Sequence, residues 1–243
     1  MDQEPRTGSS DDPRGARRLL APLRHTAVLI AIVLLAALAG AWLQRRASPG
    51  AGIAEEHRGA IEIYLSAMAL DWALFFYMWM FVRKGGTRLR ELVGGRWNAK
   101  AIALDIAIAV PFWIVWDWTA RTMHRLLGPS TARTVDILLP RTGLEMAVWI
   151  GVSLTAGFCE EAVFRGYLQK QFHALTGSAA VAVLAQAVLF GLAHGYQGIK
   201  NLIVITVLGL LYGLLALGRG NLRPGMLTHA WSDVYGGLPI QFF

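Results

Sequence analysis

Apolar segments of about 20 residues recur along this chain, which is roughly the length that an α-helix needs to cross the hydrocarbon of a bilayer. Short stretches that contain Gly, Pro and Arg separate them. Of the 243 residues, 55% are hydrophobic and only 16% are charged, whereas a soluble domain of this size needs more charge on its surface. The sequence therefore predicts an all-α, polytopic membrane helix bundle of about seven transmembrane helices. We expect the spans at about residues 25–43, 61–82, 101–118, 144–173, 178–195, 199–217 and 225–241.

Three regions follow from this pattern. Residues 1–24 have little apolar content and predict a disordered cytoplasmic tail. Residues 25–143 predict the N-terminal transmembrane helices, and residues 144–241 predict a C-terminal helical core. The segment at 25–43 has a basic flank, so a cleaved signal peptide is the alternative, although its apolar run exceeds the usual core of about 7 to 15 residues. Pro111 lies inside the third span, where we expect a kink and not a break.

The formal net charge of +7 could suit nucleic acid, but the Arg and Lys residues lie between apolar segments and not along one face. No nucleic-acid partner is therefore expected, and the charges indicate topology instead. With the N-terminus inside, fourteen of the 23 Arg and Lys residues fall on the inner side, eight on the outer side, and Arg165 within a span. This bias predicts a cytoplasmic N-terminus. Because Arg outnumbers Lys and Ala and Gly abound, we expect a bacterial cytoplasmic membrane as the location.

Ionisable side chains within apolar spans cost about 2.5 to 3.5 kcal/mol each, so each of them needs a partner or a function. The first cluster of such residues lies in Gly-Phe-Cys-Glu-Glu-Ala-Val-Phe-Arg, residues 157–165. Glu161 and Arg165 stand four residues apart, share a helix face and can pair. Glu160 points about 100° away around the helix, so its carboxylate is free to act as a general base.

Two further clusters follow along the chain. Phe190 and His194 stand one helical turn apart, and so do His229 and Asp233, where the acid can orient the imidazole ring. If the fourth and fifth spans form a hairpin, a rise of ~1.5 Å per residue brings Glu161 and His194 within about 6 Å in depth. The same count places His229 nearer the inner end of its helix, so a shared site requires tilt or an irregular segment through 220–225.

The motifs EEAVFR, FGLAH followed by GYQG, and GNLRPGMLTHAWSD resemble those of the CAAX-protease and bacteriocin-processing family of intramembrane proteases. The resemblance covers about residues 144–237, and the joint order and spacing of the motifs are more specific than any single one. It implies that residues 144–241 form a catalytic core and that the chain is an intramembrane endopeptidase acting on a membrane-associated or lipidated peptide. It further implies that Glu160 and His194 activate a water, that His229 and Asp233 stabilise or orient the oxyanion, and that Arg165 holds Glu161.

Asp233 departs from many relatives, which carry Asn at this position. An ionised aspartate cannot donate a hydrogen bond to an oxyanion, so here it would more naturally orient His229 or help to hold a metal. The family has long been called metalloproteases, yet a glutamate mechanism without a cofactor fits the same residues and is preferred. HExxH is absent, although His194, His229 and the carboxylates of Glu160 and Asp233 could bind zinc by coordination logic.

Other interpretations of the same residues remain open. Glu161 with Arg165, taken alone, is more often a structural ion pair than a catalytic one. Cys159, the single cysteine, could suggest a thiol protease, although packing is the simpler role. Asp71 and Asp105 lie within earlier spans and are interpreted as interhelical hydrogen-bonding groups, but they could also serve a proton-coupled transporter. A non-catalytic immunity or scaffold protein with the same fold is the main rival to the endopeptidase.

Overall fold

The computed structural model describes residues 18–46, 59–128 and 138–238. The predicted tail lies mostly outside these residues. The described parts form helices throughout, apart from their connections and one isolated bridge. They are α1 (Leu23–Arg46), α3 (Ala60–Lys84), α4 (Leu89–Val93), α5 (Ala99–Leu127), α7 (Gly143–Glu160), η1 (Glu161–Leu168), α8 (Gln169–Thr176), α9 (Ala179–Ala193), η2 (Gly195–Gln197), α10 (Ile199–Arg219) and α11 (Arg223–Gly236).

Five helices in the described ranges are long and apolar enough to cross a membrane, namely α1, α3, α5, the continuous helix Gly143–Thr176 and α10. The predicted all-helical membrane bundle is therefore confirmed. The spans expected at 178–195 and 225–241 form the shorter helices α9 and α11, of 15 and 14 residues. Pro111 leaves α5 continuous from Ala99 to Leu127, as expected for a helix that Pro does not break.

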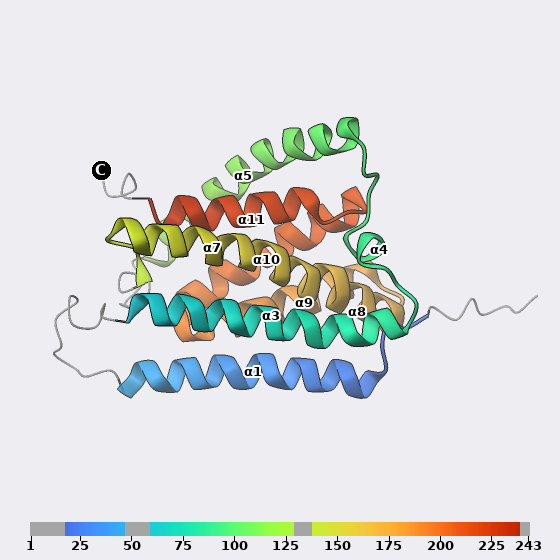
Figure 1. Ribbon diagram of the computed structural model, residues 1–243, viewed down its shortest axis with the longest axis horizontal. Helices are drawn as coiled ribbons and strands as arrows, with labels where there is room; N and C mark the ends of the chain where they lie inside the picture. Colours follow the sequence, from blue (N-terminus) through green and yellow to red (C-terminus); the bar gives the residue numbers. More distant parts are fainter. Residues whose placement is uncertain (1–17, 47–58, 129–137, 239–243) are drawn as a thin grey trace, which may run out of the picture.

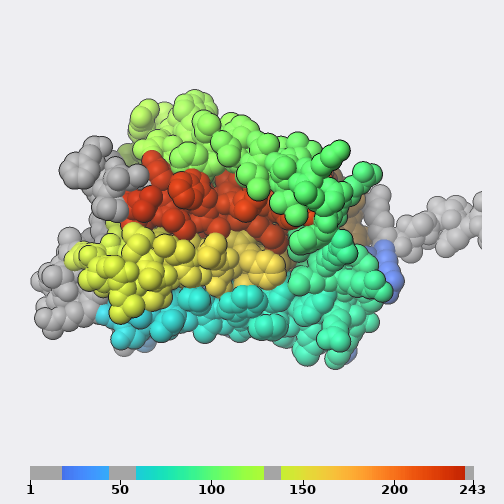
Figure 2. Space-filling model, turned by 45° about the horizontal axis from the view of Figure 1, so that its top comes forward, coloured from blue at the N-terminus to red at the C-terminus, as the bar shows by residue number. Residues whose placement is uncertain are grey.

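The helix α7 lies in the middle of the bundle, between α3 on one side and α11 on the other (Figure 1). The helix α11 lies in turn between α7 and α5, which the space-filling view shows as a red band flanked by yellow and green (Figure 2). The helices α9 and α10 pack against each other, and α1 packs against α9 and η2. This order places the three helices that carry the sequence motifs side by side.

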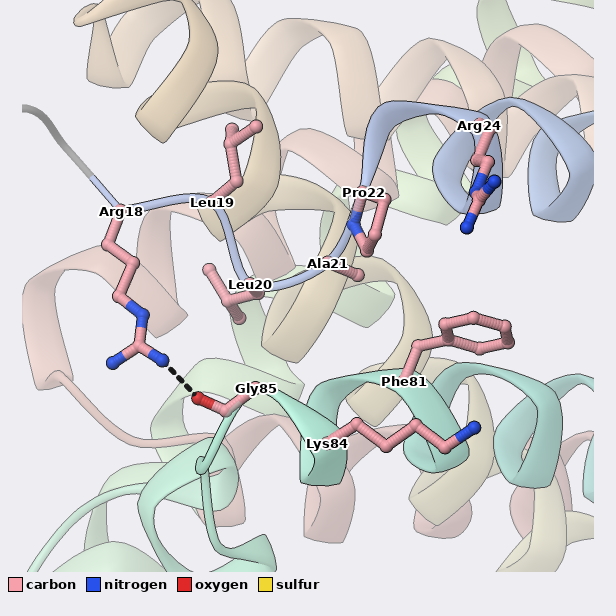
Figure 3. A pocket seen from close by; sticks show the side chains of 9 residues that line it. All are labelled: Arg18, Leu19, Leu20, Ala21, Pro22, Arg24, Phe81, Lys84 and Gly85. Carbon is pink, nitrogen blue, oxygen red and sulfur yellow. Dashed lines mark hydrogen bonds between the residues drawn. The ribbon is translucent and has the colours of Figure 1, made fainter.

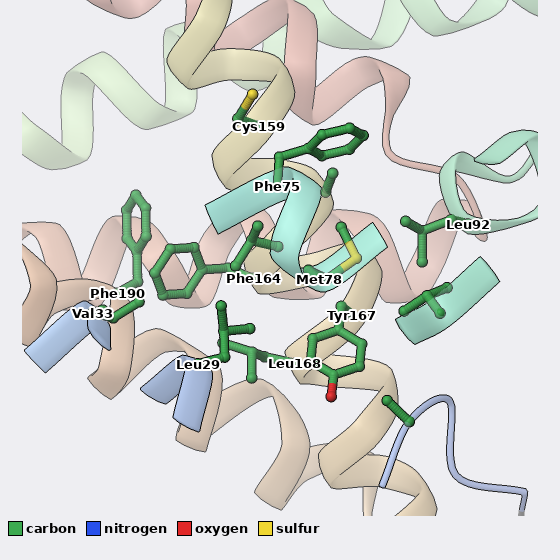
Figure 4. Close-up of a cluster of buried hydrophobic side chains, with 14 residues drawn as sticks. Leu29, Val33, Phe75, Met78, Leu92, Cys159, Phe164, Tyr167, Leu168 and Phe190 are labelled. Carbon is green, nitrogen blue, oxygen red and sulfur yellow. The ribbon is translucent and has the colours of Figure 1, made fainter. Parts of the chain in front are cut away.

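A hydrophobic cluster packs α1, α3 and α9 around the helix that runs from α7 through η1 (Figure 4). Phe75 of α3 lies 5.1 Å from Phe158 and Phe164 lies 5.0 Å from Phe190, measured between ring centroids. Cys159 belongs to this cluster and is 1% exposed. Its thiol therefore packs among apolar side chains, as the simpler interpretation of the single cysteine predicted.

A buried ion-pair cluster fixes the end of the bundle at which α10 ends and α11 begins. Asp105 of α5 is 1% exposed and accepts hydrogen bonds from Arg219 at 3.0 Å, Asn221 at 3.2 Å and Arg223 at 2.7 Å. Arg223 also donates to the carbonyl oxygen of Arg96 at 2.9 Å. The expectation that Asp105 is an interhelical hydrogen-bonding group is confirmed, because its partners come from α10, α11 and their connection.

Candidate active site

The helix that carries the first motif changes its winding at the motif itself. The α-helix α7 ends at Glu160, and the next eight residues, Glu161–Leu168, form a π-helix before α8 continues to Thr176. Such wide turns are rare and occur frequently at functional sites. All eight residues of the π-helix are buried, including Glu161 and Arg165. The sequence predicted a regular helix here, and nothing in its pattern indicated the wider turn.

Glu161 links Arg165 to His229. Its Oε1 accepts a hydrogen bond from Nη1 of Arg165 at 2.7 Å and lies 3.1 Å from Nδ1 of His229. An ionised carboxylate can only accept, so Nδ1 of His229 donates. The Arg165 guanidinium also lies over the rings of Phe190 and Tyr212, 4.2 and 5.0 Å from their centroids. Arg165 therefore holds Glu161, and Glu161 fixes the orientation of the His229 ring.

The opposite nitrogen of His229 faces two further carboxylates. Its Nε2 lies 3.8 Å from Oε2 of Glu160 and 3.7 Å from Oδ2 of Asp233. The side chains of Glu161, His229, Glu160 and Asp233 are 1%, 9%, 17% and 37% exposed. Accessibility thus rises from Glu161 outward, and Glu160 and Asp233 form the accessible side of the cluster. The sequence predicted that Asp233 could orient His229, but Glu161 is the acid that holds its Nδ1.

His194 is the C-cap residue that follows α9, and it lies next to the same cluster. The Nδ1 atom of His194 lies 2.9 Å from the carbonyl oxygen of Phe190, which can only accept, so Nδ1 donates and Nε2 of the neutral ring keeps its lone pair. The rings of His194 and His229 both lie against Phe190, with centroid distances of 4.8 and 5.9 Å. No hydrogen bond or ion pair of these described side chains joins Glu160 directly to His194.

The depth expected for Glu161 and His194 agrees with the helices. Thr176 ends α8 and Ala179 begins α9, so at ~1.5 Å per residue both site residues lie about 22 Å along their helices from this turn. His229 reaches the same level through the irregular segment that the sequence required. The α10–α11 connection pairs Asn221 with Gly94 in an isolated bridge, and α11 begins only at Arg223.

Two glycines allow α11 to approach the motif helix closely. A Cβ atom at Gly157 would lie 2.8 Å from the backbone nitrogen of Ala230 and 2.9 Å from the carbonyl oxygen of Met226. A Cβ atom at Gly225 would lie 3.1 Å from Oε2 of Glu161. A side chain at Gly157 would push α11 away from α7 and separate His229 from Glu160 and Glu161, whereas one at Gly225 would displace the Glu161 carboxylate by a few tenths of an ångström.

Three residues near the site were missed or misassigned from the sequence. Asp71 of α3, expected to form an interhelical hydrogen bond, has none in the described residues and instead interacts electrostatically with Glu160, His229 and Asp233. Tyr212 stacks on His229 with a centroid distance of 5.4 Å. Tyr196 of η2 stacks against His194 at 6.2 Å. An acid at mid-span without an obvious partner was the only signal that could have identified Asp71.

Zinc requires three or four protein ligands at about 2.0 to 2.3 Å. Within the ranges that the structure describes, no three His, Cys, Asp or Glu side chains are arranged to hold a metal ion. Nε2 of His229 lies 3.8 Å from Oε2 of Glu160 and 3.7 Å from Oδ2 of Asp233, and the proposed mechanism routes no step through a metal.

A comparison with protein families identifies the segment that holds this site. Residues 142–235 match the model of the Rce1-like family, described as type II CAAX prenyl endopeptidase Rce1-like. The resemblance to the CAAX proteases is confirmed. This Rce1-like segment is less than half of the chain, but it contains all three motifs, from Glu160 to Asp233. The comparisons with curated proteins and with solved structures found no match. Its five long apolar helices are those of an integral membrane protein, and its Rce1-like segment is similar to a family of proteases.

Proposed function

We propose that this protein is an intramembrane endopeptidase that hydrolyses a peptide bond in a membrane-associated or lipidated peptide by a glutamate mechanism. The observation that carries the proposal is the relay in which Arg165 holds Glu161, Glu161 holds Nδ1 of His229, and Nε2 of His229 faces Glu160. A structural ion pair between Glu161 and Arg165 would not require a histidine aimed at a second carboxylate. The Rce1-like match supports the same activity.

Glu160 is suited to activate water. Its Oε2 is buried and has no hydrogen-bond partner in the described residues, while the side chain as a whole is 17% exposed. A carboxylate oxygen without a protein partner can accept a hydrogen bond from water and then take its proton. Nε2 of His194, with its lone pair free, offers a second acceptor that can orient the same water. A bilayer-embedded site limits the water to what these polar groups admit.

His229 is suited to stabilise the oxyanion. Because Glu161 fixes Nδ1, a protonated Nε2 points toward the accessible side of the site, where it can donate to the oxygen of an attacked carbonyl. Asp233, which cannot donate when ionised, supports the charge on His229 from 3.7 Å.

The reaction then balances with one water. Glu160 removes a proton as the water oxygen attacks the carbonyl carbon, and the tetrahedral oxyanion accepts a hydrogen bond from His229. As the intermediate collapses, the C–N bond breaks and Glu160 returns the proton to the leaving amine. The products are a carboxylic acid and an amine, which become a carboxylate and an ammonium group when the acid gives its proton to the amine, and Glu160 is regenerated.

The charge distribution supports an orientation in the membrane. Basic side chains gather at the end where α3 ends and α5 begins, among them Lys84, Arg90, Arg96 and Lys100. The positive-inside rule favours this end in the cytoplasm, so we place the N-terminal side of α1 there, in a bacterial cytoplasmic membrane.

The test is cleavage by the purified full chain in detergent, assayed on a panel of membrane peptides and lipidated C-terminal peptides. Glu160→Gln and His194→Gln should each lower kcat by about 10²- to 10⁴-fold, the usual contribution of a general base. Cys159→Ala, next to Glu160 in the sequence but packed in the hydrophobic cluster, is the matched control and should cleave normally.

Cleavage that survives in both Glu160→Gln and His194→Gln would refute the mechanism. A wild-type protein that binds the peptides with their bonds intact would favour the non-catalytic scaffold instead. Uptake into vesicles that depends on a pH gradient would favour the transporter.

A further inference from the structure

A pocket opens between the start of α1 and the end of α3, at the end of the bundle where basic residues gather (Figure 3). Its volume is about 510 Å³, within the roughly 300 to 1,000 Å³ that is typical of small-ligand sites. It is separate from the catalytic cluster, and no motif residue lines it. The lining residues are Arg18, Leu19, Leu20, Ala21, Pro22, Arg24, Phe81, Lys84 and Gly85.

Three cations and no acid line this pocket. Arg18 uses one Nη atom to donate to the carbonyl oxygen of Gly85 at 2.6 Å, which leaves its other donors available. Arg24 and Lys84 form no ion pair with an acid in the described residues, and Figure 3 shows them on either side of Phe81. By contrast, Arg219 and Arg223 at the same end are both paired with Asp105. The pocket therefore retains an uncompensated positive charge.

The first turn of α1 adds to this positive potential. The helix begins at Leu23 beside the pocket and has no acidic residue in its first turn. The positive end of a helix dipole, together with its free N–H groups, favours an anion at this position.

The pocket is held in shape by a buried side chain. Gln171 of α8 is 0% exposed. Its Oε1 accepts from the backbone nitrogen of Leu20 at 2.8 Å, and its Nε2 donates to the carbonyl oxygen of Ala21 at 2.7 Å. A segment fixed in this way loses little conformational freedom when a ligand binds, so the pocket is already formed.

The apolar surroundings indicate which kind of anion fits. Leu19, Leu20 and Phe81 line the pocket beside the cations. Val28 and Leu35 follow Arg24 by four and eleven residues, so they lie on the same side of α1 as Arg24. They are 47% and 64% exposed, so this apolar side faces lipid in a membrane. A ligand with an anionic head and hydrocarbon chains would place its head on the cations and its chains along α1.

We infer that this pocket binds the phosphate headgroup of an anionic phospholipid, with the acyl chains running along α1. The geometry favours a lipid over a soluble anion because the cationic pocket is continuous with the apolar face of α1. The inference does not depend on the proposed peptidase activity.

The experiment is native mass spectrometry of the full-length protein in non-ionic detergent, titrated with phosphatidylglycerol. The wild type should bind one phosphatidylglycerol in preference to phosphatidylcholine. Arg24→Gln/Lys84→Gln should weaken that binding roughly 30-fold, because each basic residue near an anionic headgroup contributes ~1 kcal/mol and tenfold corresponds to 1.4 kcal/mol. The matched control is Arg83→Gln/Lys100→Gln, which removes one exposed Arg and one exposed Lys from the same end, outside the pocket, and should bind as the wild type does.

Three results would overturn the inference. Equal weakening in both double variants would show that bulk charge, and not the pocket, attracts the lipid. Equal affinity for phosphatidylcholine would show that no anionic headgroup is recognised. Displacement of phosphatidylglycerol by millimolar inorganic phosphate would assign the pocket to a soluble anion.

Discussion

Two carboxylates inside the helix bundle, Asp105 and Glu160, occupy very different surroundings in this membrane protein. Asp105 uses both of its oxygens, accepting hydrogen bonds from Arg219, Asn221 and Arg223. Glu160 has a buried oxygen without any hydrogen-bond partner and a histidine nitrogen only at 3.8 Å. A carboxylate whose oxygens all accept hydrogen bonds from neighbouring helices holds those helices together. A carboxylate with an oxygen that lacks a partner is available for chemistry. The number of hydrogen-bond partners therefore separates the structural carboxylate from the candidate catalytic one.

The sharpest difference should appear when Glu160 is replaced by Gln. We expect cleavage to fall by about 10²- to 10⁴-fold, while stability is kept or raised, because the change removes a charge that no hydrogen bond compensates. Thermal unfolding in detergent, measured beside the cleavage rate, checks both parts. A large loss of stability would show that Glu160 is structural, as Asp105 is.

Asp105→Ala should show the opposite behaviour. It leaves Arg223, whose side chain is 11% exposed, without its acid, and removing one partner of a buried pair costs about 3 to 5 kcal/mol. Denaturant unfolding in micelles should show this loss, while activity per folded molecule stays near that of the wild type. Full stability in Asp105→Ala would remove the contrast between the two carboxylates.

Arg165→Ala tests a residue that has both a structural role, as Asp105 has, and a role in the candidate active site, as Glu160 has. It leaves Glu161 buried without its guanidinium partner and loosens the hold of Glu161 on His229. We expect lower protein yield together with lower activity, with a destabilisation of about 3 kcal/mol. Yield in the membrane and specific activity are measured together, and a normal yield of folded protein would show that the pair is not structural.

Asp233→Asn should have a small effect. The ring of His229 is already oriented by Glu161 through Nδ1, and an amide in place of Asp233 supplies two donors near the oxyanion. We expect activity within about tenfold of the wild type, since no hydrogen bond to Nδ1 is lost. The assay is repeated after chelation and zinc add-back. Loss in the variant, together with zinc-restorable loss in the wild type, would establish a metal site.

Cys159→Ala should change least. The thiol packs in the hydrophobic cluster, and a water mechanism needs no thiol. Activity should match the wild type, and stability should fall by about 1 kcal/mol for one small truncation in a packed core. Complete loss of cleavage would restore the cysteine nucleophile.

The sequence predicted those parts of the site that depend on residues or helices close together along the chain. The pairing of Glu161 with Arg165 follows from four residues on one helix, and the depth of His194 follows from a helical hairpin. The hold of Glu161 on His229 joins residues 68 positions apart, and it depends on how closely α11 packs at Gly157. Helix packing of this kind has no local pattern, so the sequence assigned the orienting role to the neighbour of His229, Asp233, instead.

The π-helix at Glu161–Leu168 sets the phase between two faces of one continuous helix. A wider turn advances by a smaller angle per residue than an α-helix does, so the face before it and the face after it are out of step with regular winding. Before the π-helix, Gly157 packs against α11. After it, Gln171 accepts a hydrogen bond from the backbone nitrogen of Leu20, just before α1. The wide segment thus sets the rotation about the helix axis between α7 and α8, which are both α-helices of the same pitch. Deleting one residue from Glu161–Leu168 would rotate α8 relative to α7 about the helix axis. Gly157 could then no longer pack against α11 while Gln171 bonds the segment before α1.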